Sequence, residues 1–161
     1  MLYTKLALTM VWAGKFGSGC ENSSVYGLNK NRPGFTDIYA TIGLDGSGFL
    51  ELRLGTDIIT LGGADLRNTA GAIGWTYSSP TGTGGTYRVV YKPHGGAEQV
   101  YTGSFVGAPP GEVPGVDAWV LTLAHATPGF GGINPLWFEG DHVYWFIMQD
   151  DVSSSELDIL I

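Results

Sequence analysis

The chain has 161 residues, of which 43% are hydrophobic and 14% charged, and its formal net charge at pH 7 is −7. This length suits a single domain spanning residues 1–161, with enough apolar side chains to bury a core without disulfide support. With 15 acidic against 8 basic residues and no basic cluster, the sequence disfavours binding to nucleic acid or to an anionic membrane surface. A lone cysteine, Cys20, excludes an intrachain disulfide and a cysteine-based zinc site.

The first predicted element is a strand near the amino terminus. The apolar residues Leu6, Leu8, Met10 and Trp12 occur at alternate positions, which is the period of a half-buried strand. A lipoprotein signal ending at Cys20 is the alternative interpretation, but the charged and glycine residues just before the cysteine fit it poorly. The segment 14–33 is polar and turn-rich, so we expect a long surface loop or an arm there.

A hairpin over residues 36–54 is the clearest signal in the chain. It turns on the sequence Asp-Gly-Ser-Gly at 45–48, in which Gly48 takes the left-handed position of a bulged turn. This register pairs leucines 50, 52 and 54 with apolar partners at 44, 42 and 40 on one face. Glu51 and Arg53 then lie on the other face, which we expect to be exposed to solvent.

The remaining predicted strands are short and separated by glycine-rich or proline-rich turns. They cover approximately 56–61, 73–77, 87–92, 97–105, 117–126, a hairpin closing at 140–141, and 156–161. No window shows sustained helical periodicity. The sequence therefore predicts an all-β fold, an antiparallel β-sandwich resembling a jelly roll, with nine or ten short strands and long glycine-rich loops.

The hairpin 136–147 is the candidate binding surface. Its predicted register places Phe138 opposite Val143 and Leu136 opposite Trp145 on a wholly apolar core face. The other face carries a carboxylate, an imidazole and three aromatic rings: Trp137, Glu139, His142, Tyr144 and Phe146. Three interpretations stay open for this face: a second buried layer, a protein interface, or a sugar site built on stacking aromatics.

No motif indicates catalysis or a metal. The three histidines, His94, His125 and His142, lack the short spacing that places two ligands on one face. Acidic residues near 150–158 are typical of solvated loops more often than of a calcium site. A glycosidase pair drawn from Glu51, Glu98, Glu112 and Glu139 is conceivable, but the sequence does not show which carboxylates face one another. We therefore expect no metal, no cofactor and no enzymatic activity.

The many short strands, the glycine-, serine-, threonine- and tyrosine-rich loops, the polar segment 14–33 and the acidic charge together resemble accessory virion proteins of tailed bacteriophages. The types meant are capsid decoration proteins and tail or fibre modules. This resemblance implies a non-enzymatic virion structural protein that associates with itself and with other virion proteins on the particle. A carbohydrate-binding module or receptor-binding domain that uses the outward aromatic residues of 136–147 is the alternative function, with glycans as partners.

Overall fold

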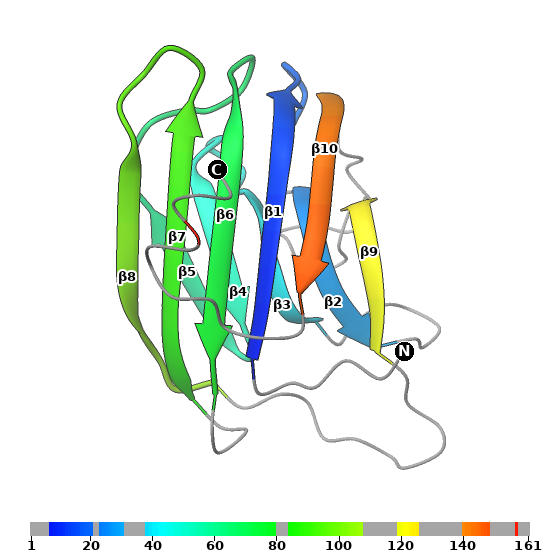
Figure 1. Cartoon of the computed structure of the whole chain (residues 1–161), viewed down its shortest axis with the longest axis vertical. Helices are drawn as coiled ribbons and strands as arrows, with labels where there is room; N and C mark the ends of the chain where they lie inside the picture. The colour runs from blue at the N-terminus through cyan, green and yellow to red at the C-terminus, as the bar shows by residue number, and fades with distance from the viewer. Residues whose placement is uncertain are drawn as a thin grey trace.

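The computed structural model describes residues 7–20, 23–30, 38–79, 84–107, 119–125 and 140–148, together with Leu157. These residues form ten strands in two five-stranded sheets, which lie face to face (Figure 1). Each pair of neighbouring strands is antiparallel. The predicted all-β antiparallel sandwich is confirmed, and Leu157 is the one helical residue in the described ranges.

Sheet A and sheet B each contain strands from distant parts of the chain. In spatial order, sheet A consists of β10 (Gly140–Met148), β1 (Ala7–Phe16), β6 (Ala70–Ser78), β7 (Gly85–Pro93) and β8 (Gln99–Phe105). Sheet B consists of β5 (Asp57–Leu61), β4 (Leu50–Leu54), β3 (Ile38–Leu44), β2 (Ser23–Lys30) and β9 (Trp119–His125). Strands β2 to β5 and β6 to β8 thus form two meanders, one in each sheet.

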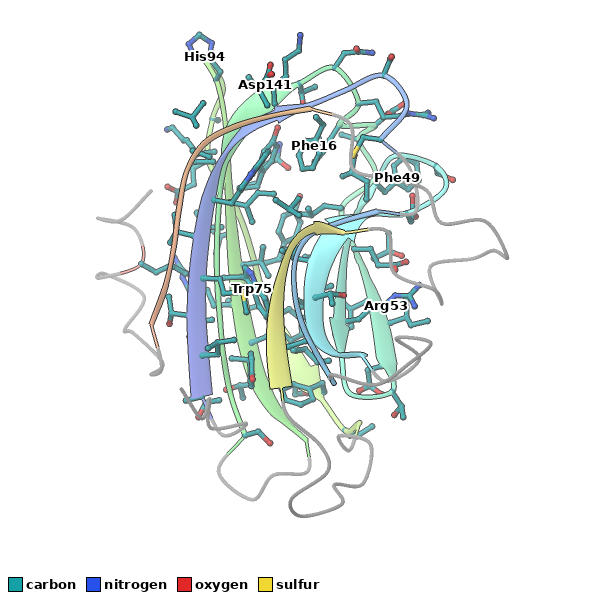
Figure 2. All side chains as sticks on the ribbon, turned by 90° about the vertical axis from the view of Figure 1, so that its right-hand side faces the viewer. Phe16, Phe49, Arg53, Trp75, His94 and Asp141 are labelled. Atoms are coloured by element: carbon teal, nitrogen blue, oxygen red, sulfur yellow. The ribbon has the colours of Figure 1, made fainter. Side chains whose placement is uncertain are left out.

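The core lies between the sheets and contains the apolar residues that the sequence assigned to it, although Thr9 and Val11, between them on β1, are buried too. Leu8, Met10 and Trp12 of β1 are buried, as are the three leucines of β4. Trp75 of β6 lies in the same layer, and Figure 2 shows it between the two sheets. Its ring stacks on that of Tyr77, with the centroids 5.9 Å apart. Large aromatic side chains therefore fill much of the space that separates the sheets.

The β3–β4 hairpin has the predicted register. Leu44 pairs with Leu50, Ile42 with Leu52 and Ala40 with Leu54, and these six side chains are buried. At the turn, Gly48 has a φ of 81° and donates its N–H to the carbonyl oxygen of Asp45 at 3.0 Å. Oδ1 of Asp45 accepts bonds from two further backbone N–H groups, at 2.8 and 2.9 Å. Turn chemistry and side-chain alternation thus select one register together.

We expect Gly48→Ala to destabilise the fold by about 1–2 kcal/mol, because the left-handed conformation is costly for a residue with a Cβ. The new methyl group would also collide with Asp65, whose pKa is lowered by its hydrogen bonds to Arg67. Urea unfolding measures the effect. Gly63→Ala is the matched control, since a Cβ there meets nothing within 4 Å and its midpoint should stay near that of the wild type.

The prediction of a long loop or arm at 14–33 is wrong. Strand β1 continues to Phe16, and residues 23–30 form β2, which pairs with β3 on one side and β9 on the other. Tyr26 and Leu28 stand among serine, asparagine, lysine and glycine, so the local composition resembles that of a turn. Neighbouring strands supply hydrogen bonds on both sides, and this tertiary pairing overrides the weak local preference.

The position of Val143 also corrects the sequence-based register of 136–147. Val143 was expected in the core, but its side chain is 79% exposed. Strand β10 pairs with β1, and a β-bulge lies where Gly14 pairs with His142 and Ala13 with Tyr144. Val143 is the extra residue of this bulge, and a bulge disrupts the strict alternation of faces. Residues 136–139 lie outside the described ranges, as does the predicted strand 156–161 apart from Leu157, which is buried.

Candidate functional site

A group of buried polar side chains lies on the side of sheet B that faces away from sheet A. Thr41 comes from β3, and Glu51 and Arg53 come from β4, where residues two apart share a face. The register places Thr41 opposite Arg53 and Gly43 opposite Glu51. Figure 2 shows Arg53 beyond sheet B, on the side opposite Trp75. We call these three residues the Thr41–Glu51–Arg53 site.

The carboxylate and guanidinium of this site form an ion pair. Nε of Arg53 donates to Oε1 of Glu51 at 2.9 Å. Their side chains are only 13% and 8% exposed, respectively. Both charges have therefore lost most of their contact with water, which is costly unless other groups compensate for it. The prediction that Glu51 and Arg53 lie on a solvent-exposed face is wrong. Their side chains point away from the core between the sheets, but they are nearly buried all the same.

The hydroxyl of Thr41 is the exceptional group of the site. Thr41 is fully buried, and its Oγ1 has no hydrogen-bond partner. A buried hydroxyl without a partner costs about 1–3 kcal/mol. Thr9, equally buried on β1 of the other sheet, shows the usual solution, since its hydroxyl donates to that of Thr76 at 3.0 Å. The indole Nε1 of Trp75 in the core also has no partner, so the feature that distinguishes Thr41 is the nearly buried ion pair beside it.

The site is buried on the β3 side and is bordered by exposed residues on the β5 side. Thr41 and Gly43 on β3 are buried, and Glu51 and Arg53 on β4 retain slight exposure. On β5, Ile58 lies opposite Arg53 and is 59% exposed, and Thr60 opposite Glu51 is exposed as well. On the β5 side, the site is therefore bordered by one exposed apolar residue and one exposed polar residue.

The chemistry of the site combines an acceptor with donors. The carboxylate of Glu51 accepts hydrogen bonds, the guanidinium of Arg53 donates them, and the hydroxyl of Thr41 does either. Such a set suits a ligand that presents a donor and an acceptor side by side. Among the residues that the structure describes, no group of three or more histidine, cysteine, aspartate or glutamate side chains is arranged to hold a metal ion.

Among the described residues, two hollows lie at the surface of sheet A. One of about 290 Å³ is polar and is lined by Lys15, Gly17, Ser18, Asn68, Gly140 and Asp141. The other, of about 410 Å³, is mainly apolar and lies against Ala13, Ala72, Pro93 and Val143, among others. The polar side chains lining both hollows are exposed, so neither contains a buried group that needs a ligand.

The residues predicted to bind from the sequence lie elsewhere. His142, Tyr144 and Phe146 belong to β10 at one edge of sheet A, whereas the Thr41–Glu51–Arg53 site lies on sheet B. Trp137 and Glu139 lie outside the described ranges. The proposed binding role of these five residues stays a prediction. Thr41 went unnoticed in the sequence because nothing local marks a threonine whose hydroxyl is sealed from water.

The histidines and the cysteine are placed as follows. His94 follows the end of β7 and is exposed, and His125 ends β9. Cys20 is buried and, within the described part of the chain, forms no disulfide. In the described part of the chain, no helix has the length and apolar character needed to cross a bilayer.

Comparison with known proteins finds similarity to a solved structure. No family model matches the chain, and no curated protein matches it. The chain is similar to the crystal structure of scytalido-glutamic peptidase with a transition state analog inhibitor, at a TM-score of 0.45 and 11% sequence identity. The match covers 92% of this chain and 77% of the peptidase chain.

This comparison overturns two predictions made from the sequence. The chain was expected to be a non-enzymatic virion structural protein, with carbohydrate or receptor binding as the alternative, and was expected not to be an enzyme. The structure found is that of an enzyme, and no virion protein was found. A likeness this weak assigns no activity, because unrelated functions share folds. The resemblance to phage proteins, the virion location and the virion partners stay untested predictions.

Proposed function

We propose that this chain binds an extended peptide segment on the outer face of sheet B, at the Thr41–Glu51–Arg53 site. The observation that carries the proposal is the fully buried, unpartnered hydroxyl of Thr41 beside a nearly buried ion pair. A ligand that supplies the missing hydrogen bond offsets the cost of this hydroxyl, and binding then requires the fully buried Thr41 to become accessible. The free protein is thus less stable at this position than it is with the ligand bound.

A peptide group matches the donors and acceptors of the site. Its N–H is a donor for the carboxylate of Glu51, and its carbonyl oxygen is an acceptor for the guanidinium of Arg53 or the hydroxyl of Thr41. Ile58, 59% exposed on the β5 side, offers an apolar contact for a side chain of the peptide.

Hydrolysis of the bound amide is a second candidate function, favoured by the same neighbours. A carboxylate can accept a proton from water as the water oxygen attacks the amide carbon, and can then return that proton to the amide nitrogen as the C–N bond breaks and the amine leaves. Donors close to the carbonyl oxygen then stabilise the negative charge that develops on it. Glu51 supplies the first group, and Arg53 and Thr41 supply the second.

The test begins with an array of short peptides of random sequence with blocked termini, probed with the labelled full chain. Peptides that bind are then titrated in solution and incubated with the protein, and mass spectrometry detects any cleavage products. Saturable binding of a peptide class supports the proposal. If no peptide binds at concentrations up to the millimolar range, the peptide proposal is wrong.

Thr41→Val should separate binding from stability. Valine keeps the shape of threonine and removes the unpaired hydroxyl, so we expect the free protein to gain about 1 kcal/mol or more in unfolding free energy while peptide binding weakens. Urea unfolding and peptide titration measure the two effects on the same preparation.

Thr9→Val is the control for that substitution. Thr9 is equally buried, but its hydroxyl is bonded to that of Thr76, so the change should destabilise the fold by about 1 kcal/mol and leave peptide binding intact. If Thr41→Val destabilises the protein as Thr9→Val does and binding is unaffected, the Thr41 hydroxyl has a structural role and the site is misassigned.

A further inference from the structure

The larger hollow on sheet A combines an apolar floor with polar groups at one side. It lies on the outer face of the sheet, has a volume of about 410 Å³, and is lined by residues of β10, β1, β6 and β7 and of the turn after β7. Figure 2 shows His94, one of these lining residues, at the same end of the sandwich as Asp141. The volume is within the range of small-molecule sites, which is about 300–1,000 Å³.

Two alanines in register form the floor of this hollow. Ala13 on β1 lies opposite Ala72 on β6. Both side chains point away from the core, since the adjacent Trp12 and Ile73 are buried between the sheets and successive residues of a strand alternate in direction. Val143, 79% exposed, borders the floor on the β10 side. Small side chains beside larger ones thus leave a mainly apolar depression in the sheet surface.

Lys92 and His94 supply the polar groups of the hollow. Lys92 lies opposite Ala72 in the β6–β7 register. The backbone N–H of His94 donates to the carbonyl oxygen of Ala70 at 2.8 Å, so this residue also stands beside the floor. Lys92 is a cation, and the imidazole of His94 has a ring N–H to donate. Among the described residues that line the hollow, none is an aspartate or a glutamate.

Lys92 carries a positive charge that no described carboxylate balances. Arg53 and Arg67 each form an ion pair with a carboxylate. In the part of the chain that the structure describes, Lys92 forms no ion pair, and its ammonium group makes no hydrogen bond. This contrast arises in a chain whose net charge is −7, with acidic residues in excess. The hollow therefore presents an uncompensated positive charge beside an apolar surface, which is complementary to an apolar anion.

We propose that this hollow binds a small aromatic carboxylate. The aromatic body covers the floor of Ala13 and Ala72, and the carboxylate reaches the ammonium group of Lys92 and the ring N–H of His94. Hydrogen bonds from a charged donor to a carboxylate are among the stronger ones in proteins. Burial of the apolar body supplies most of the affinity, and the charge selects acids over neutral molecules of the same shape.

A small molecule fits this hollow better than a protein partner does. A stable protein interface involves about 20–30 residues on each side. The lining here consists of ten residues, and five of them are alanine or glycine with exposed or half-buried positions on the sheet surface or in the adjoining turn: Ala13, Ala70, Gly71, Ala72 and Gly95. The hollow therefore has the extent of a ligand site. It shares no residue with the Thr41–Glu51–Arg53 site and lies on the other sheet, so each proposal can fail without the other.

Titration of the isotope-labelled full chain with naphthoate, followed by nuclear magnetic resonance, tests this site. We expect saturable shifts of the backbone amides of Ala13, Ala72 and Lys92. Naphthamide, the neutral analogue of the same shape, should bind about five-fold more weakly, because it lacks the charge that Lys92 attracts. The absence of saturable shifts at these amides with millimolar naphthoate overturns the proposal. Equal affinity for the acid and the amide overturns the assignment of the site to carboxylates.

Lys92→Ala tests the charge without filling the hollow. The side chain is exposed, so we expect the fold to persist. The variant should bind naphthoate about five-fold more weakly and should bind naphthamide as the wild type does. Unchanged affinity for naphthoate would remove Lys92 from the site.

Ala72→Leu tests the floor, since a larger side chain fills the space that the aromatic body occupies. It should abolish the binding of both ligands, and urea unfolding shows whether the variant is folded. Ala64→Leu is the matched control, because Ala64 is exposed and does not line the hollow. If folded Ala72→Leu binds naphthoate as Ala64→Leu does, the ligand lies elsewhere and the proposal is wrong.

Discussion

Glu51→Ala is expected to reduce peptide affinity by about 30-fold or more, the largest functional effect in the molecule. Loss of a peptide hydrogen bond to a charged group costs about 2–3 kcal/mol of binding free energy, whereas the broken ion pair lowers the stability of the free and the bound protein alike. Glu51 and Arg53 form this ion pair, with side chains 8% and 13% exposed and a bond of 2.9 Å. Alanine removes the acceptor for the peptide N–H and leaves the guanidinium of Arg53 without its carboxylate. Isothermal titration calorimetry with an array-selected peptide measures the change.

Two controls accompany Glu51→Ala. Glu98→Ala removes the same charge from an exposed position, so it should leave the affinity unchanged. Urea unfolding of each variant shows whether the fold persists, and a peptide assay is meaningful only below the unfolding transition. If folded Glu51→Ala binds peptide as the wild type does, Glu51 is not part of the site.

Trp12→Ala is expected to destabilise the protein by about 3–5 kcal/mol, the largest effect on stability. Trp12 is 1% exposed in the layer between the sheets, and its ring centroid lies 5.0 Å from that of Phe16. Alanine would leave a cavity that the two sheets cannot close, because neighbouring strands fix their positions. The shift of the urea midpoint measures this loss.

Val143→Ala is the comparison for Trp12→Ala. Val143 is 79% exposed, so its truncation should change the unfolding free energy by less than about 0.5 kcal/mol. Equal effects at the two positions would contradict the assignment of Trp12 to the core.

The sequence was most informative where local chemistry and packing agree. At the β3–β4 hairpin, the turn residues and the alternation of leucines select the same register, and the structure has that register. The strand at Leu8, Met10 and Trp12 was likewise predictable, since large apolar side chains alternate with smaller ones. Both segments needed only interactions between neighbours in the chain.

Strand β2 and the bulge in β10 needed interactions that the sequence does not display. The eight residues of β2 are largely polar or small, and their strand conformation depends on β3 and β9, which pair with them from elsewhere in the chain. At Val143, one extra residue exposed a side chain that strict alternation assigns to the core. Alternation assumes an uninterrupted ladder, and a single bulge breaks that assumption.

The candidate site was hidden for a different reason. Alternation placed Glu51 and Arg53 correctly on the outward face, but it contains no information on what reaches that face. The burial of Thr41 and its lack of a hydrogen-bond partner are properties of the assembled sandwich. The prediction that the chain does not favour binding to nucleic acid rests on its charge alone and stays a prediction.

A titration of isotope-labelled protein with the array-selected peptide, followed by nuclear magnetic resonance, tests the site most directly. The Nε–H group of Arg53, which donates to Glu51, gives its own resonance, and the backbone amides of Thr41 and Ile58 report on the two ends of the site. We predict saturable shifts of these three signals at one common affinity. Shifts confined to strands of sheet A, with these three signals unmoved, would contradict the account.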